Sequence, residues 1–409
     1  MKKNIIVGQS GGPTAVINAS LYGIIKEGLN HPEEIDRIYG MVHGIEGFLA
    51  NHLIDLSKDL SLEDLELLKL TPAAYLGSCR FKLPESFSSE VYLTLFSKFE
   101  ELNIGYFFYI GGNDSMDTVS KLSRYAEKSK SDIRFIGIPK TIDNDLVGTD
   151  HTPGFGSAAK YVASTVREIA LDASVYQQKS VTIVELMGRH AGWITASAML
   201  ARKHPLDNPL LIYLPEVPFE FEEFSKDLAA AFNKNPNVVI CVSEGIADST
   251  GHFICEYSSE AQLDTFGHKM LTGCGEILEN YIRNQFGVKV RSIELNVSQR
   301  CSGMVVSATD IEEAAMAGIQ GVQAALCGHT GEMVAFSRQL DAPYTLAPAM
   351  VDVNEVCNKE KTFPKEWITE HGTDIGPEFL TYALPLIKGE VNRKMEHGVP
   401  VYCYRTSTH

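Results

Sequence analysis

A lysine and two carboxylates stand close together in residues 139–145, which read PKTIDND. Asp143 and Asp145 are two residues apart, and Lys140 precedes them. Carboxylates so spaced can accept a proton or hold a hard metal ion, and an ammonium group can neutralise phosphate. An ordinary turn rich in Asp and Asn is the alternative. We expect a base, a metal ion and a phosphate to meet at this segment.

Two loops with paired glycines could bind an anion. Residues 8–14 read GQSGGPT, and residues 111–117 read GGNDSMD. Glycine lets backbone N–H groups approach phosphate oxygens, and a helix that follows presents its positive end. The first loop lacks P-loop spacing and could be a tight turn. In the second loop, Asp114 or Ser115 could instead cap a helix.

Three more loops place one charged residue near glycine. They are residues 75–81 with Arg80, residues 187–190 with Arg189 and residues 243–245 with Glu244. A charged group beside a glycine can grip a polar ligand, but each loop alone is also a common turn. Each of these loops alone is a weak indication of a binding site, and the indication becomes stronger because all of them occur in one chain.

Short apolar runs precede these loops and alternate with stretches of helical periodicity. Residues 105–110, GYFFYI, are a continuous apolar run typical of a buried parallel strand. Ligands bind at the carboxyl ends of strands in open α/β sheets, which is where these loops would lie. The pattern predicts an α/β fold with mostly parallel sheets. The expected strands are 4–7, 105–110, 134–138, 181–186, 210–214 and 238–242, and the expected helices are 15–29, 115–128, 190–202, 221–233 and 310–325.

The composition is that of a globular protein with an acidic surface. The 409 residues are 44% hydrophobic, which suits two or three domains and excludes disorder and fibrous repeats. A net charge of −16 repels nucleic acid and anionic membranes, so an anionic substrate needs a local cluster of positive groups. Eight cysteines without a C-x-x-C pair indicate free thiols. With no apolar run of ~18 residues and no signal peptide pattern, we expect a cytoplasmic protein without a membrane partner.

Taken together, the loops resemble the phosphofructokinase family over most of the chain. The motifs are G-G near the start, G-S-x-R-F, G-G-x-D-S, T-I-D-N-D, M-G-R and S-E-G. Residues 291–300, RSIELNVSQR, are similar to the late substrate segment of the family. The resemblance implies two doubly wound, mostly parallel-sheet domains with the active site in the cleft between them. It places the phosphoryl-donor domain at 1–148 plus about 305–365, and the sugar domain at 149–304 plus about 366–409.

Asp114 and Lys140 resemble the pyrophosphate-dependent branch of the family, because the ATP-dependent enzymes typically have glycine at both positions. Asp114 would lie near the space for the α-phosphate of ATP. Two like charges ~4 Å apart cost about 4 kcal/mol at an effective dielectric of ~20, which is roughly a thousandfold. Lys140 would restore the positive charge that transfer from pyrophosphate requires. For Asp114 alone, a helix cap remains the alternative.

The resemblance implies Mg²⁺-assisted phosphoryl transfer between pyrophosphate and the C1 oxygen of fructose 6-phosphate. Asp143 would accept the proton of the C1 hydroxyl, which is worth roughly 10²–10⁴-fold. Lys140 and Arg80 would neutralise the transferred group, and Asn113 and Asp145 would organise the metal. The other implied substrate positions are Gly12 and Gly112 for pyrophosphate, and Thr141, Ile142, Met187, Gly188, Arg189, Glu244, Arg291, Val297 and Arg300 for the sugar phosphate.

Arg291 matches a position that reaches a neighbouring subunit's site in relatives, which implies a homo-oligomer, either a dimer or a tetramer, with shared sites. Three positions depart from the family pattern. Asn113 replaces an aspartate linked to Mg²⁺, and Val297 replaces a histidine that contacts phosphate. Ser180, next to Lys179, stands where ATP-dependent enzymes usually have a second intersubunit arginine.

Three rival functions stay open at this point. An ATP-dependent 6-phosphofructokinase is disfavoured by Asp114 and Lys140. A non-catalytic regulatory subunit of the same fold is disfavoured by the intact T-I-D-N-D loop. A plain nucleotide-binding module is disfavoured because no G-x-G-x-x-G follows an expected strand.

Overall fold

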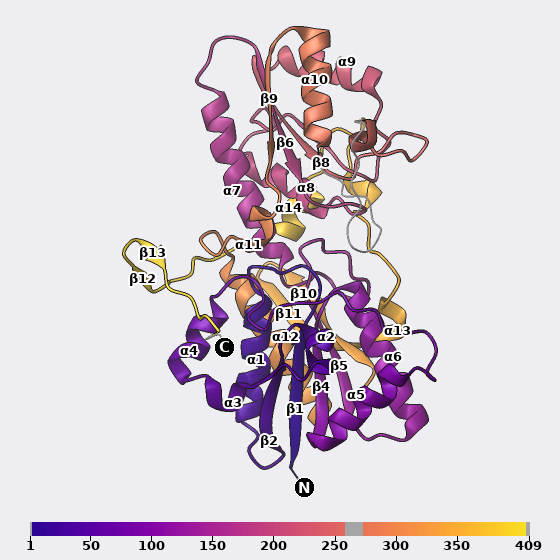
Figure 1. The fold of residues 1–409 in the computed structure, drawn as a ribbon. Helices are drawn as coiled ribbons and strands as arrows, with labels where there is room; N and C mark the ends of the chain where they lie inside the picture. Colours follow the sequence, from indigo (N-terminus) through magenta and orange to yellow (C-terminus); the bar gives the residue numbers. More distant parts are fainter. Residues whose placement is uncertain (1, 258–272, 406–409) are drawn as a thin grey trace.

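The computed structural model describes residues 2–257 and 273–405, which form two lobes stacked one above the other in Figure 1. The first lobe contains a seven-stranded sheet with the order β11-β10-β5-β4-β1-β2-β3. The second lobe contains a four-stranded sheet with the order β7-β8-β6-β9. Helices pack on both faces of each sheet. The predicted α/β class with mostly parallel sheets is confirmed.

The sheet of the first lobe is parallel at its centre and antiparallel at its edges. Within β4, Phe107 faces one hydrophobic cluster and Phe108 faces the opposite one, because successive side chains point to opposite sides of a strand. Helices therefore cover both sides, which explains why the run GYFFYI carries no polar face. The parallel strands are β1 (Lys3–Gln9), β2 (Ile35–Met41), β4 (Ile104–Gly111), β5 (Arg134–Pro139) and β10 (Glu332–Asp341), and the antiparallel ones are β3 (Leu53–Asp55) and β11 (Tyr344–Asp352).

Four long helices sandwich this sheet. They are α1 (Ile17–Leu29) and α12 (Ala308–Leu326) on one face, and α5 (Glu90–Glu101) and α6 (Asn113–Ser129) on the other. Shorter elements complete the described part of both lobes. They are α2 (Gly44–Leu49), α3 (Leu56–Asp59), α4 (Leu62–Lys69), η2 (Ile254–Tyr257), α11 (Ser298–Cys301), α13 (Val353–Val356), η3 (Lys365–Trp367), β12 (Met395–Glu396) and β13 (Val399–Pro400).

The sheet of the second lobe is parallel throughout. Its strands are β6 (Ser180–Leu186), β7 (Leu211–Tyr213), β8 (Asn237–Ser243) and β9 (Lys289–Glu294). One face is covered by α7 (Phe155–Ala173), α8 (Trp193–Ala196), the 3₁₀ helix η1 (Ser197–Ala201) and α14 (Glu378–Ala383), and the other by α9 (Phe221–Phe232) and α10 (Cys274–Phe286). The helix expected at 190–202 thus begins three residues later and continues as a 3₁₀ helix.

The chain passes between the lobes more than once. Residues 140–154 lead from β5 into α7, and the chain returns between Val356, which packs in the first lobe, and Phe363, which packs in the second. Cys403 lies in a cluster of the first lobe, and its N–H donates to Thr71 Oγ1 at 2.9 Å. The last described residues therefore lie on the first lobe, unlike the predicted segment 366–409. The domain boundaries as a whole stay a prediction.

The described helices include none that could cross a bilayer, since each is too short or too polar.

Candidate functional site

Four loops of the first lobe meet at the carboxyl ends of its parallel strands. The N–H of Lys140 donates to the Gly111 carbonyl at 3.0 Å, which joins the loops after β5 and β4. The N–H of Gly11 donates to the Cys79 carbonyl at 3.2 Å, which joins the loop after β1 to the segment that carries Arg80. Parallel strands bring their ends to one edge, so the predicted loops assemble there as the sequence indicated.

Lys140 is buried and points at the glycine pair after β1. Its side chain is 3% exposed, and Nζ donates to the Gly12 carbonyl at 2.6 Å. A Cβ added to Gly11, whose φ is +74, would lie 3.5 Å from that Nζ. Burial lowers the pKa of Lys140 to about 8, although Asp143 and Asp145 oppose the shift. An ammonium in this place is ready to pair with an anion in the glycine loop.

Asp143 has the surroundings of a general base. Burial raises the pKa of its carboxyl group, while Thr141 and Lys140 oppose the rise. Thr141 Oγ1 lies 3.3 Å from Asp143 Oδ2 and also accepts the Asp143 N–H at 3.1 Å. For Asp145, burial and then the charge of Asp143 raise the pKa to about 7. Carboxylates with raised pKa values at the ends of strands are common in active sites.

Arg300 brings a third segment of the chain to the same place. It lies on α11, and its Nη1 would be 3.1 Å from a Cβ added to Gly12. After burial, the charges of Arg300 and Arg80 are further causes of the low pKa of Lys140. Positive groups from distant segments therefore gather around Gly12. This is the local positive cluster that an acidic chain needs to capture an anion.

Two loops of the second lobe interlock beside this cluster. Glu244 Oε1 accepts the N–H of Gly188 at 3.3 Å, and the Ser243 hydroxyl donates to the Gly188 carbonyl. Burial raises the pKa of Glu244 to about 7, and the charge of Arg189 opposes the rise. Arg189 also opposes the raised pKa of Asp143, which belongs to the first lobe. The two lobes thus share one electrostatic environment.

We call Gly12, Lys140, Asp143, Arg189 and Arg300 the central cluster. Gln299, next to Arg300 of this cluster, is a site neighbour that no sequence motif predicted. Gln299 is 2% exposed, and its Oε1 accepts the N–H of Met187 at 3.2 Å. Its place directly before Arg300 in the segment RSIELNVSQR was the available signal.

Two side chains at the start of α6 have surroundings that the motif alone does not indicate. Gly112 does lie near the Lys140 loop, because an added Cβ would be 3.6 Å from the Lys140 carbonyl oxygen. Asp114 is 82% exposed and lies 3.9 Å from Lys82. Asn113 accepts the N–H of Asn358 and donates to the Lys359 carbonyl, both at 2.5 Å. Asn113 therefore fastens the segment that returns to the second lobe, and its metal role stays a prediction.

Arg291 lies apart from the central cluster, whereas the carbonyl of Val297 accepts the N–H of Arg300 at 3.1 Å. Arg291 is on β9 opposite Thr182, about four residues and ~13 Å short of the strand end at Leu186. Its side chain is 46% exposed, with Asp172 at 3.9 Å. Val297 is 51% exposed just before α11.

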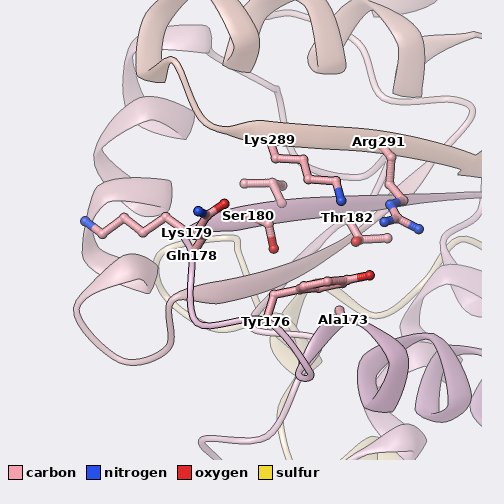
Figure 2. Close-up of a pocket in the computed structure, with 9 residues that line it drawn as sticks. Ala173, Tyr176, Gln178, Lys179, Ser180, Thr182, Lys289 and Arg291 are labelled. Atoms are coloured by element: carbon pink, nitrogen blue, oxygen red, sulfur yellow. The ribbon is translucent and has the colours of Figure 1, made fainter.

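Figure 2 shows the pocket that Arg291 borders, which we call the edge pocket. Lys289 Nζ lies 4.8 Å from the centroid of the Tyr176 ring on its opposite wall. The pocket is lined by Ala173, Tyr176, Gln178, Lys179, Ser180, Val181, Thr182, Lys289 and Arg291.

The two-lobed α/β fold and the central cluster together define a protein that handles phosphate groups at the ends of parallel strands. Residues 4–325 match the family described as Phosphofructokinase, and the chain belongs to that family.

Within the family, the chain is more similar to pyrophosphate-dependent members than to an ATP-dependent one. The chain is 38% identical over 400 residues to a pyrophosphate–fructose 6-phosphate 1-phosphotransferase of Halomonas elongata, covering 97% of this chain and 94% of that one. A solved pyrophosphate-dependent phosphofructokinase from Marinobacter aquaeolei has a TM-score of 0.89 at 36% identity, covering 98% of this chain and 95% of that one. An ATP-dependent 6-phosphofructokinase of Corynebacterium efficiens is more distant, with 29% identity over 362 residues, covering 88% of this chain and 95% of that one.

Proposed function

We propose that this chain reversibly transfers a phosphoryl group between pyrophosphate and the C1 oxygen of fructose 6-phosphate. The observation that carries the proposal is the buried Lys140 ammonium, 2.6 Å from the Gly12 carbonyl and beside the carboxylate of Asp143. A full positive charge held out of water stabilises the charge that spreads over a transferred phosphoryl group. Two relatives that align with nearly the whole chain are named for the same reaction: one as a pyrophosphate–fructose 6-phosphate 1-phosphotransferase and the other as a pyrophosphate-dependent phosphofructokinase.

Asp143 acts as the base in this reaction. Its Oδ atoms accept the proton of the C1 hydroxyl as the oxygen attacks phosphorus, and Thr141 holds the carboxylate in place. In the reverse direction Asp143 returns the proton to the leaving oxygen. Lys140, Arg80 and Arg300 neutralise phosphate oxygens around Gly12.

The second lobe supplies the sugar site. Met187, Gly188 and Arg189 contact the sugar phosphate, and Glu244 accepts a hydrogen bond from a sugar hydroxyl in place of the Gly188 N–H. The 6-phosphate role of Arg300 stays a prediction, because its guanidinium lies beside Gly12 in this structure. These substrates are metabolites of the cytoplasm, and a cytoplasmic location is part of the proposal.

The residues around Asp143 fit a Mg²⁺ ion. The charge of Asp143 helps to raise the pKa of Asp145, and a cation near both would relieve that repulsion. Within residues 2–257 and 273–405, no group of three or more His, Cys, Asp or Glu could hold a metal. Mg²⁺ commonly takes one or two carboxylates and completes its shell with phosphate oxygens and water. Asp145, and Asn113 as the sequence predicts, would hold the ion, which would neutralise charge on the pyrophosphate oxygens.

A second copy of the chain completes the sugar site in this proposal. Arg291 is too far along β9 to reach the central cluster of its own chain. Exposed apolar side chains lie near it at the end of α7 and just beyond, where Leu171 is 66% exposed and Val175 is 68% exposed. Apolar groups around a solvated arginine suit a surface that another subunit covers.

The proposal is tested by initial rates with fructose 6-phosphate and Mg²⁺, using pyrophosphate in one series and ATP in the other. We expect a rate with pyrophosphate that exceeds the rate with ATP by at least about a hundredfold, and a reverse reaction from fructose 1,6-bisphosphate and phosphate. The Asp143→Asn protein, prepared in parallel, shows that the rate belongs to this chain. A higher rate with ATP would contradict the choice of donor, and no rate with either would indicate a non-catalytic subunit.

A further inference from the structure

Asn144 stands between the two carboxylates of the T-I-D-N-D loop, and its side chain is held from both ends. It is fully buried, with a left-handed backbone at a φ of 56. Its Oδ1 accepts the N–H of Thr152 at 3.0 Å, and its Nδ2 donates to Tyr382 Oη at 2.7 Å. Since Asp143 and Asp145 flank Asn144, anything that fixes this amide also limits where the two carboxylates point.

Tyr382 reaches the loop from a segment 238 residues away. It lies on α14, is 8% exposed, and its Oη donates to the Asp150 carbonyl at 2.8 Å. Its ring packs against Trp193 and Trp367, with centroids 5.2 Å and 5.6 Å away. The hydroxyl therefore receives one hydrogen bond and gives another, and the aromatic contacts leave the ring little freedom to move.

Asp150, whose carbonyl accepts from Tyr382, is itself tied to two other elements, β10 and α12. The Asp150 carboxylate lies 2.8 Å from His151 Nδ1 and 2.9 Å from Arg338 of β10. His151 Nε2 lies 2.7 Å from Glu313 of α12. These buried charges face one another and hold residues 150–151 between the sheet and α12. The T-I-D-N-D loop is hydrogen-bonded to this network through Tyr382, so the network restricts how far the loop can move.

We propose that Tyr382 is a positioning residue for the base Asp143, acting through the Asn144 amide. The proposal rests on the proposed function, because it assumes that Asp143 takes the proton of the acceptor. A catalytic group must be held within a fraction of an ångström of its working position, and supporting hydrogen bonds supply that accuracy. No sequence motif marks Tyr382, since it touches the loop only through the fold.

Tyr382→Phe tests the proposal, because it keeps the packed ring and removes only the hydroxyl. We expect kcat to fall by between about tenfold and about a hundredfold, with the KM for pyrophosphate within about twofold of wild type. Tyr213→Phe is the matched control. Tyr213 is equally buried at 8% exposure, and its hydroxyl donates to Asp227 of α9 at 3.0 Å, away from the catalytic loop. The control should lose stability without losing kcat.

A double-mutant cycle with Asn144→Gly separates this role from a general weakening of the lobe. Glycine tolerates the left-handed backbone and removes the whole side chain, including the amide that bonds Tyr382 and Thr152. We expect Asn144→Gly to lower kcat at least as much as Tyr382→Phe, and the double variant to be no worse than Asn144→Gly alone. Independent, multiplying losses would overturn the proposal, as would wild-type kcat in Tyr382→Phe.

The two proposals fail in distinguishable ways. The cycle is measured with whichever donor the wild-type protein uses, so a preference for ATP would count against the proposed donor alone. Equal kcat values in wild type and Tyr382→Phe, with wild-type activity intact, would count against the positioning role alone.

Discussion

The central cluster and the edge pocket are both rich in cations, yet they differ in how their charges are held. Lys140 is 3% exposed and bonded to a carbonyl, whereas the Arg291 side chain is 46% exposed, with its carboxylate partner Asp172 at 3.9 Å. Charges out of water interact strongly, while solvated pairs contribute little. The central cluster is therefore held by contacts within one chain, whereas the role of the edge pocket rests on the proposed second copy of the chain.

The largest effect is expected at the base of the central cluster. Asp143→Asn keeps the shape of the side chain and removes its ability to take a proton. We expect kcat to fall by about a thousandfold, with KM values little changed, because the lost interaction forms in the transition state. Steady-state rates in both directions measure it. A variant that keeps more than about a tenth of the wild-type kcat would show that another group serves as base.

Arg291→Ala tests whether the edge pocket works for another subunit. We expect kcat/KM for fructose 6-phosphate to fall by about a hundredfold, while the KM for pyrophosphate stays unchanged.

Mixing the Arg291→Ala and Asp143→Asn proteins gives the decisive comparison. If Arg291 serves a neighbouring chain, hybrids contain sites with both residues intact, and activity returns on mixing. Each variant mixed with itself under the same conditions is the control. If subunits are shown to exchange and no activity returns, Arg291 contributes to the site of its own chain.

Buried charge in the first lobe should make stability depend on pH, and exposed charge at the edge pocket should not. Burial alone would lower the pKa of His151, but its hydrogen bonds to Asp150 and Glu313 prevail and raise it to about 8. The ordinary value is 6.5, so the stabilisation is present below about pH 6.5 and is lost as the pH rises through about 8. A shift of this size corresponds to about 2 kcal/mol, or about thirtyfold in the folding equilibrium.

Urea unfolding at about pH 6 and about pH 9 measures this loss in wild type and in His151→Gln. Glutamine can keep one hydrogen bond but cannot titrate. The free energy of unfolding of the His151→Gln protein should therefore change less over that pH range. Asp172→Asn, at the edge pocket, is the exposed control and should follow wild type. Identical pH dependence in wild type and His151→Gln would show that other groups cause the effect.

The sequence predicted well those elements whose signal is local. The run GYFFYI predicted a strand at 105–110, and the strand spans Ile104–Gly111 because both of its faces are buried. The hairpin of β10 and β11 was missed. Most of β11 is exposed or half-buried, and much of β10 beyond Phe336 is as well, so neither shows the continuous apolar pattern of a buried strand.

In the site, too, residues within one motif could be predicted, and contacts between distant segments could not. Lys140 and Asp143 follow from one short motif, because both stand in the segment PKTIDND, although Lys140 Nζ donates to the carbonyl of Gly12, 128 residues away. The contact between Asn144 and Tyr382 joins residues 238 apart, and only the packing of α14 against the second lobe creates it. The direction of the Asp114 side chain likewise depends on Lys82 and on solvent, which a motif does not encode.

Substitution of Asp114 is expected to change the kinetics least. Here the structure greatly lowers the gain in ATP use that the sequence alone would predict. At ~4 Å and an effective dielectric of ~20, its repulsion of an ATP phosphate would cost about 4 kcal/mol. The side chain is 82% exposed and lies 3.9 Å from Lys82, so water and a counter-charge screen it. With a dielectric near ~80 the cost is about 1 kcal/mol, and Asp114→Gly should raise kcat/KM for ATP by only about fivefold.

Asp114→Asn is the matched variant, because it removes the charge and keeps the size of the side chain. A similar gain in both variants would assign the effect to charge, and a gain in Asp114→Gly alone would assign it to space. A gain near a thousandfold would mean that Asp114 turns inward when the donor binds and loses its solvent screening. With the modest gain expected here, the charge of Asp114 alone would not account for a strong preference for pyrophosphate over ATP.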